Sequence, residues 1–294
     1  MPANRTQSSS ARDASDTASP EAEERWADVS GGKLRYLAQG TGAPLVLLHG
    51  IVASSFSFRL VSPDLSRDFR LFIPDLRVAG ADASLRPTAT RILQLFAREG
   101  IESADLLGSS HGGAVAMELA ATAAHRIRRL ILVSPANPFA RGYHRVVNFY
   151  LSRPGGIFIR LAPFAPVPIW EYAIKRMCGE SSILALGIGA GYRQPLRERG
   201  ITGHIRSSLQ TFITEVEALR PKLSELRNIP TLLIWGDHDP VVELESGHQL
   251  QQALGAKMVV MPGIGHLPYE ENPEEFSRIV LKYLGIGSSG HRVI

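Results

Sequence analysis

The residues best suited to chemistry are a serine, an aspartate and a histidine that follow one another in that order along the chain. Ser110 stands at the centre of Gly108-Ser109-Ser110-His111-Gly112, a G-x-S-x-G pattern. This pattern is typical of a strand that turns sharply into a helix and exposes a nucleophilic serine at the apex. The turn strains the serine backbone and leaves little room for a Cβ atom at either glycine. The N-terminus of the helix that follows favours negative charge, so it would stabilise an oxyanion that develops beside the serine.

A serine hydroxyl is a weak nucleophile, so it needs a nearby base, and that base needs an acid to orient it. Asp239 and His266 each follow a short apolar run, as Ser110 does. If those runs are parallel strands, their carboxyl ends meet at the edge of the sheet where ligands bind. The order and spacing therefore predict Ser110 as nucleophile, His266 as base and Asp239 as acid. Asp237 is kept as the alternative acid.

The segments that must position these residues alternate between two patterns. Short apolar or alternating runs predict strands at 33–39, 44–48, 69–74, 104–107, 130–133, 231–235 and 257–261. Apolar residues at helical spacing predict helices at 55–65, 88–99, 114–124, 243–254 and 273–284. Strands that alternate with helices indicate an α/β fold with a mainly parallel twisted sheet and helices on both faces.

One connection is too long for a simple crossover. Roughly 95 residues separate the strand at 130–133 from the strand at 231–235, whereas a crossover helix needs about a dozen. Apolar residues recur at helical spacing within it, over 145–151, 157–161, 169–177 and 205–219. We therefore expect a mostly helical cap over 137–225, inserted into a core formed by 25–136 and 226–285. Its aromatic side chains are expected mainly to form its own core, with some of them lining an apolar pocket.

Composition narrows the class of protein further. Residues 1–24 contain almost no large apolar side chain and predict a disordered tail, and 286–294 predict a frayed one. The net charge is +4, from 32 basic and 28 acidic residues that are scattered, which favours a solvated surface over a nucleic-acid site. No apolar run reaches the length of a membrane span and no signal peptide is recognisable, so we expect a soluble cytoplasmic protein. The single cysteine, Cys178, has no partner for a disulfide or a CxxC site, and no metal or organic cofactor is expected.

The chain resembles the α/β-hydrolase fold family over about residues 26–285. The matching segments are LVLLHG (45–50), PDLR (74–77), LLGSSHGG (106–113), LLIWGDHDPVV (232–242) and PGIGHLPYEENPEEF (262–276). The resemblance implies that Asp239, the second acidic residue of a WGxxD-type segment, is the triad acid. It also implies an oxyanion hole made of the backbone N–H groups of Ile51 and His111.

Two features place the chain within that family. Many members carry DxRGxGxS after the fourth strand, whereas residues 75–84 here are DLRVAGADAS, so a reshaped loop is expected. The nucleophile position holds a serine, which argues against the haloalkane dehalogenase and epoxide hydrolase branches, because those attack through a carboxylate. The resemblance therefore implies the esterase-like branch of serine hydrolases.

The expected function is hydrolysis of a carboxylic ester or a related small apolar acyl compound through an acyl-enzyme. The same triad could instead cleave a C–C bond in a diketone-type substrate, or act as an amidase, lactonase, thioesterase or cofactor-free perhydrolase, because fold does not fix the substrate. A ligand receptor on a hydrolase scaffold, with little turnover, is the alternative from another class. The oligomeric state stays open.

Overall fold

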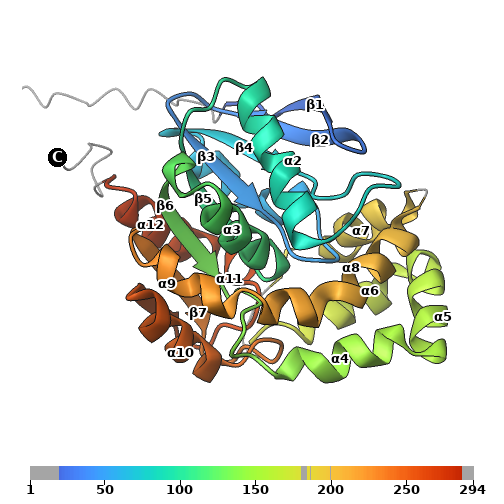
Figure 1. Ribbon diagram of the computed structural model, residues 1–294. Coiled ribbons are helices and arrows are strands. Elements are labelled where there is room, and N and C mark those ends of the chain that lie inside the picture. Colours follow the sequence, from blue (N-terminus) through green and yellow to red (C-terminus); the bar gives the residue numbers. More distant parts are fainter. Residues whose placement is uncertain (1–19, 180–183, 186, 199, 287–294) are drawn as a thin grey trace, which may run out of the picture.

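An eight-stranded sheet runs through the centre of the protein (Figure 1). The computed structural model describes residues 20–179, 184–185, 187–198 and 200–286. In spatial order the strands are β1 (Glu23–Val29), β2 (Gly32–Gln39), β4 (Phe69–Pro74), β3 (Ala43–Leu48), β5 (Ala104–Ser109), β6 (Ile127–Val133), β7 (Thr231–Gly236) and β8 (Lys257–Met261). β2 pairs antiparallel with β1 and β4, and every other pair is parallel, which confirms the mainly parallel sheet.

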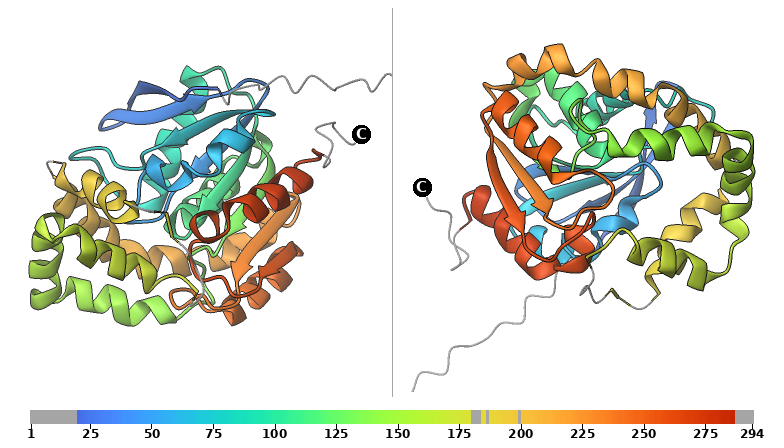
Figure 2. Two further views of the ribbon diagram at one scale, coloured as in Figure 1. Left: turned by 180° about the vertical axis from the view of Figure 1, so that it is seen from behind. Right: turned by 90° about the horizontal axis from the view of Figure 1, so that it is seen from below.

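The central strand β3 is apolar throughout because helices cover both faces of the sheet (Figures 1 and 2). In β3, Val46 and Leu48 belong to the core cluster that includes α2 (Leu85–Arg98), α3 (His111–Thr122) and α10 (Leu244–Leu254). Leu45 and Leu47 belong to the other cluster, with α1 (Ser62–Leu65) and α12 (Pro273–Tyr283). A strand buried on both sides has no polar face, so its sequence is a continuous apolar run rather than an alternation.

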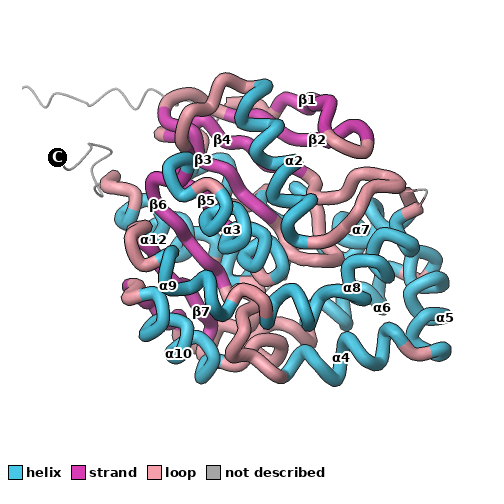
Figure 3. Tube along the Cα trace, in the orientation of Figure 1, coloured by secondary structure: helices cyan, strands magenta, loops and turns pink. Residues whose placement is uncertain are grey.

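The connection between β6 and β7, residues 134–230, is mainly helical, as Figure 3 shows. We call it the β6–β7 insertion. Its helices are α4 (Gly142–Leu151), α5 (Arg153–Leu161), α6 (Val167–Lys175), α7 (Ile188–Arg193), α8 (Ile201–Glu217) and α9 (Leu223–Leu226), with short 3₁₀ turns η3 (Ala162–Phe164), η4 (Gln194–Arg197) and η5 (Arg220–Lys222). It lies at the end of the sheet toward which the parallel strands point (Figure 1).

Several expected boundaries need correction. The helix expected over 55–65 is a 3₁₀ turn, η1 (Ser55–Phe58), followed by α1. Pro63 lies at the start of α1, and a proline inside a continuous helix would lose a hydrogen bond and clash with the preceding turn. The N-terminal tail was expected to reach residue 24, but β1 already begins at Glu23. Ile286, assigned to the C-terminal tail, is buried, while 1–19 and 287–294 lie outside the described residues.

The strand β1 escaped sequence analysis because it forms the edge of the sheet. Only Ala27 in it is fully buried, and its other side chains are exposed or half-buried. An edge strand with one covered position leaves almost no apolar alternation to detect. A short helix after β8, α11 (Pro268–Glu271), was missed for a related reason, since four residues carry no helical period.

Candidate active site

Ser110 adopts the strained backbone that the G-x-S-x-G pattern predicts. Its φ is 51° and its ψ is −118°, and among the described non-glycine residues only Ser110 and Ser134 have a positive φ. A Cβ atom on Gly108 would overlap the backbone of Gly112, and one on Gly112 would overlap the carbonyl groups that end β3. The Ser110 N–H donates to Val133 O at 3.0 Å, which links the turn at Ser110, called the elbow below, to the end of β6. The two glycines are therefore required by the close approach of α3 to the sheet.

His266 and Asp239 form a buried pair. Asp239 Oδ2 lies 2.8 Å from His266 Nδ1, and the two side chains are 0% and 2% exposed respectively. The other carboxylate oxygen, Oδ1, accepts from the N–H groups of Val241 at 2.8 Å and Val242 at 3.0 Å. The carboxylate is thus held from both sides, and its contact with Nδ1 leaves Nε2 as the ring nitrogen that can accept a proton. The His266 N–H donates to Met177 O in the β6–β7 insertion at 2.7 Å.

Asp237, the alternative acid, faces a different neighbour. Its Oδ1 lies 2.7 Å from His238 Nδ1 and accepts from the Gly263 N–H at 2.7 Å. Its side chain is 33% exposed. Of the two candidate acids, the structure therefore brings only Asp239 to His266.

The serine and the histidine come from segments that approach each other at the carboxyl end of the sheet. Tyr269, three residues after His266, has its hydroxyl oxygen 3.3 Å from Ser109 Oγ, next to the elbow. Within the described residues, Ser110 and His266 do not hydrogen-bond directly. Such contacts are often long before substrate binds and tighten in the reacting complex.

Ile51 and His111, whose N–H groups are expected to form an oxyanion hole, belong to segments next to Ser110. A Cβ atom built on Gly50 would stand 3.5 Å from Ser110 Cβ, so the turn that carries Ile51 packs directly on the elbow. His111 is the first residue of α3, and a helix leaves its first N–H groups without internal acceptors. Neither N–H meets a backbone or side-chain acceptor in the part of the chain that the structure describes. Both N–H groups are therefore available to donate to a bound ligand.

The His111 ring does not supply a second base. It stacks on Phe212 of α8, with ring centroids 5.8 Å apart and planes 20° apart. Burial lowers the pKa of His111 to about 3, with a smaller effect from neighbouring His49 and His204. The ring is neutral at physiological pH and serves as packing between the core and the β6–β7 insertion.

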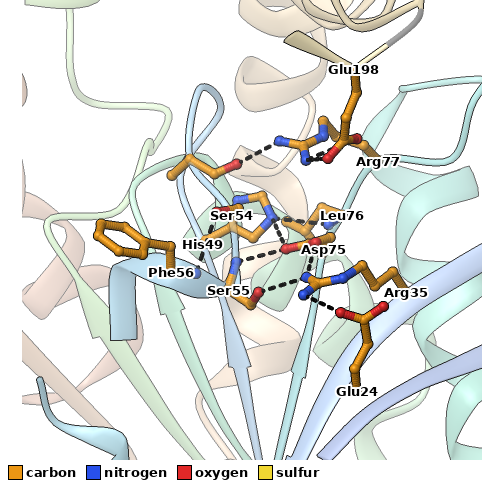
Figure 4. A network of polar contacts seen from close by, with 11 residues as sticks. Glu24, Arg35, His49, Ser54, Ser55, Phe56, Asp75, Leu76, Arg77 and Glu198 are labelled. Carbon is orange, nitrogen blue, oxygen red and sulfur yellow. Dashed lines mark hydrogen bonds and ion pairs between the residues drawn. The ribbon is translucent and has the colours of Figure 1, made fainter. Parts of the chain in front are cut away.

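A polar network beneath the turn at 50–55 contains residues whose part in the site the sequence did not reveal (Figure 4). His49 Nε2 accepts from the Leu76 N–H at 2.9 Å, while Nδ1 donates to Gly50 O at 2.8 Å. This requires the neutral ring, and burial lowers the pKa of His49 to about 4. Because the ring joins the end of β3 to the end of β4, it fixes the path of the turn that carries Ile51.

The same turn is held by a buried carboxylate. Asp75 accepts from the Ser55 N–H at 2.7 Å and from Arg35 at 2.7 Å, and Arg77 donates to Ala53 O at 3.0 Å. Burial would raise the pKa of Asp75, but the surrounding positive groups and the Ser55 N–H outweigh it, so this pKa lies below its usual value. Sequence analysis had no signal for Arg35, because it reaches Asp75 from β2, which is remote in sequence.

Glu271 supports the loop on either side of His266. Its carboxylate accepts from the Gly265 N–H at 2.9 Å and from the Leu267 N–H at 3.1 Å. It also accepts from the Gly179 N–H of the β6–β7 insertion at 2.7 Å. One side chain thus joins the histidine loop to the insertion. The residue lies inside the matching segment 262–276, but nothing in its type or spacing indicated this role.

A second contact fastens the insertion to the core. Tyr192 of α7 donates to Glu270 Oε1 at 3.0 Å, and Arg59 donates to both oxygens of that carboxylate, at 2.6 and 3.0 Å. The Tyr192 ring also meets Phe56 edge-on, with centroids 5.7 Å apart. Burial raises the pKa of Glu270 despite the Arg59 guanidinium. Over the residues described, no three His, Cys, Asp or Glu side chains are arranged to bind a metal ion.

Comparison with known proteins identifies the fold family. The model of the α/β-hydrolase fold family matches residues 43–273. The chain is 26% identical over 263 residues to Lipase 3 of Moraxella sp. (strain TA144), covering 83% of this chain and 78% of the lipase. It is also 26% identical over 297 residues to Haloalkane dehalogenase 2 of Mycobacterium bovis, covering 90% and 95%.

Solved structures give the same result for the fold. The 2-hydroxy-6-oxo-6-phenylhexa-2,4-dienoate hydrolase of Rhodococcus sp. strain RHA1 superposes with a TM-score of 0.74 at 21% identity, covering 90% of this chain and 99% of that one. Because the family model covers most of the chain, the protein belongs to the α/β-hydrolase fold family. It is an enzyme of the hydrolase class.

Proposed function

We propose that the protein is a serine hydrolase that cleaves a carboxylic ester or a related small acyl substrate. The observation that carries the proposal is the buried His266–Asp239 pair at 2.8 Å, on the same sheet edge as a serine with a φ of 51°. Ser110 is also what separates this chain from relatives that attack through a carboxylate. A serine at the elbow favours acyl transfer.

In the proposed reaction, Ser110 Oγ attacks the acyl carbonyl carbon while His266 Nε2 takes the hydroxyl proton. The Ile51 and His111 N–H groups bind the oxyanion, and each such donor contributes roughly 3–4 kcal/mol in other hydrolases. His266 then gives its proton to the departing alcohol, which leaves an acyl group on Ser110. Water then attacks the acyl-enzyme in the same way, with His266 again as base, and releases the carboxylic acid from Ser110. Asp239 stabilises the imidazolium during acylation and deacylation.

The β6–β7 insertion is proposed to act as the cap over 137–225 that sets substrate size. Its support is the contact of Phe212 with the His111 ring and the hydrogen bond that the His266 backbone N–H donates to Met177 O. These contacts, at His111 and at His266, support the proposal that the insertion covers the site. The cytoplasmic location and the domain boundaries stay predictions.

A fluorophosphonate probe tests the proposal directly. We expect covalent labelling of the parent protein, mapped by peptide mass spectrometry to Ser110, together with turnover of a p-nitrophenyl ester. The Ser110→Ala variant is the matched control and should lose both the labelling and the turnover. Activity that came from other side chains would survive in this variant. A parent protein that binds ligands but shows neither labelling nor turnover would instead be a receptor on a hydrolase scaffold.

A further inference from the structure

The outer helices of the β6–β7 insertion expose large apolar side chains. The described residues contain eleven large hydrophobic side chains that are exposed, and three of these, Trp26, Val52 and Val260, are scattered over the core. The other eight lie on α4, η3, α5 and α6: Val146, Phe149, Ile157, Phe158, Leu161, Phe164, Ile169 and Tyr172. Single exposed apolar residues are normal on a soluble protein, whereas a cluster of this kind marks an interaction site.

The spacing of these residues places them on one side of each helix. In α5, Ile157, Phe158 and Leu161 are exposed while Gly155 and Ile159, on the opposite side, are buried. Residues three and four positions apart lie on one helical face, so α5 carries apolar side chains on its exposed side as well as on its buried side. Packing against the rest of the protein accounts for the buried side of α5 and leaves its exposed apolar side unexplained.

Aromatic contacts make the surface continuous between helices. The Tyr150 ring lies 5.4 Å from the Phe149 ring on α4 and 5.9 Å from the Phe158 ring on α5. The turn η3 continues directly from α5 and carries Phe164, which is 73% exposed. We call this surface of α4, α5, η3 and α6 the outer face. Figures 1 and 2 show these helices on the side of the insertion remote from the sheet.

The helices of the outer face also lie in a basic stretch of the chain. Residues 141–179 contain six basic side chains and one acidic side chain, Glu171, for a net charge of +5, although the whole chain carries only +4. The six are all exposed: Arg141, Arg145, Arg153, Arg160, Lys175 and Arg176. Their side chains form no ion pair with any residue that the structure describes. Six of the 32 basic residues thus lie on, or at the ends of, the helices that carry the exposed apolar side chains.

We infer that the outer face binds the surface of an anionic lipid membrane, with its helices lying along that surface. Helices that combine exposed Phe, Leu and Ile with Lys and Arg bind the boundary between headgroups and acyl chains, and anionic lipids attract the basic residues. A second copy of this chain fits poorly, because a two-fold contact would bring one +5 surface against another. This inference goes beyond the proposed function and does not depend on catalysis.

The geometry favours binding along the membrane rather than crossing it. Within the described residues, no single helix is long and apolar enough to cross a membrane. The helical segments Arg153–Phe164 and Val167–Lys175 together have the required length and composition, but they meet at an angle of 119°. Both segments of the bent pair have exposed apolar side chains, while Ile159 and Ile174 are buried in the protein.

Flotation with lipid vesicles tests the inference. The full chain is mixed with vesicles of ether-linked phosphatidylcholine, with or without ether-linked phosphatidylglycerol, because ether lipids offer no carboxylic ester to hydrolyse. We expect binding to the anionic vesicles that weakens as salt is raised. Phe158→Asp combined with Leu161→Asp should lower the apparent affinity at least tenfold. Arg153→Glu combined with Arg160→Glu should lower it roughly fivefold for each positive charge removed.

Matched variants elsewhere on the surface serve as controls. Trp26→Asp removes an aromatic side chain that is 49% exposed on the edge strand, and Arg86→Glu with Lys257→Glu reverses two exposed basic residues of the core. These should bind vesicles as the parent does, with circular dichroism melting curves checking that every variant folds. Absence of binding to anionic vesicles, or equal losses in control and outer-face variants, would overturn the inference. So would a dimer in sedimentation velocity that Phe158→Asp dissociates, since the face would then join two protein copies.

Discussion

Replacing Asp239 by asparagine changes the site by one atom and tests the assignment of the acid. Asp239 is fully buried, with Oδ1 held by the Val241 and Val242 N–H groups and Oδ2 facing His266 Nδ1 at 2.8 Å. In the asparagine variant, the carbonyl oxygen must face the two N–H groups, because an NH₂ group cannot accept their hydrogen bonds. Its NH₂ group must then face Nδ1, so the ring carries its proton on Nε2 and cannot accept one from Ser110.

The expected loss can be bounded from this geometry. The Asp239 side chain has no exposed surface, so its own NH₂ group would decide which ring nitrogen carries the proton. The equivalent change in another serine triad lowers kcat by about 10⁴, and each factor of ten corresponds to about 1.36 kcal/mol in the activation barrier. We expect Asp239→Asn to lower kcat by between about 10² and 10⁴, with the melting temperature nearly unchanged because every hydrogen bond keeps a partner.

The assay is steady-state hydrolysis of a p-nitrophenyl ester by the parent, Asp239→Asn and Asp237→Asn proteins. Asp237 is the matched control, since it is two residues away but contacts His238 and Gly263 instead of the base. Its variant should keep most of the activity. If Asp237→Asn proves the more damaging of the two, the triad acid has been misassigned. If neither matters, the His266–Asp239 pair is structural and the proposed mechanism fails.

Four further expectations can be measured on the same protein. Ser110→Ala should lower kcat by on the order of 10⁴ to 10⁶ with an unchanged fold by circular dichroism, and retention of a tenth of the activity would exclude Ser110 as nucleophile. Phe212→Ala, at the contact between insertion and elbow, should shift kcat/KM from short toward longer p-nitrophenyl esters; an unchanged ratio would count against the insertion as the specificity element. Glu271→Ala should lower kcat more than it raises KM while Glu271→Gln recovers part of it, since the amide oxygen can still accept; equal activity of the two variants would mean that Glu271 only supports the fold. Because burial lowers the pKa of His49 to about 4 and of His111 to about 3, both rings stay neutral in the fold while the unfolded chain protonates near 6.5. In urea titrations the free energy of unfolding should therefore be highest above pH 6.5 and should fall by about 1.4 kcal/mol per histidine per pH unit between pH 6 and 4.5. His49→Gln should reduce that slope; an unchanged slope would mean that the His49 ring is charged in the fold.

Much of the fold could be predicted because the signals are local. The strands at 44–48 and 231–235 are buried on both faces, so each is a nearly continuous apolar run. Such a run can be recognised without knowing which strands lie beside it. The elbow could be predicted for a similar reason, because the glycines at 108 and 112 are demanded by a single tight turn. Boundaries were less accurate: β5 runs on to Ser109 and α2 begins at Leu85, since capping and pairing decide element ends.

The sequence by itself determined which residue types are present, their order along the chain and the strand ends on which they fall. It did not determine which aspartate meets His266, because Asp237 and Asp239 are only two residues apart and their separation in space depends on the turn after β7. Nor did it reveal that basic and apolar residues of 141–179 share one surface. These are contacts between segments distant in sequence, and only the packed chain decides them, because packing places side chains within a few ångströms irrespective of their spacing along the backbone.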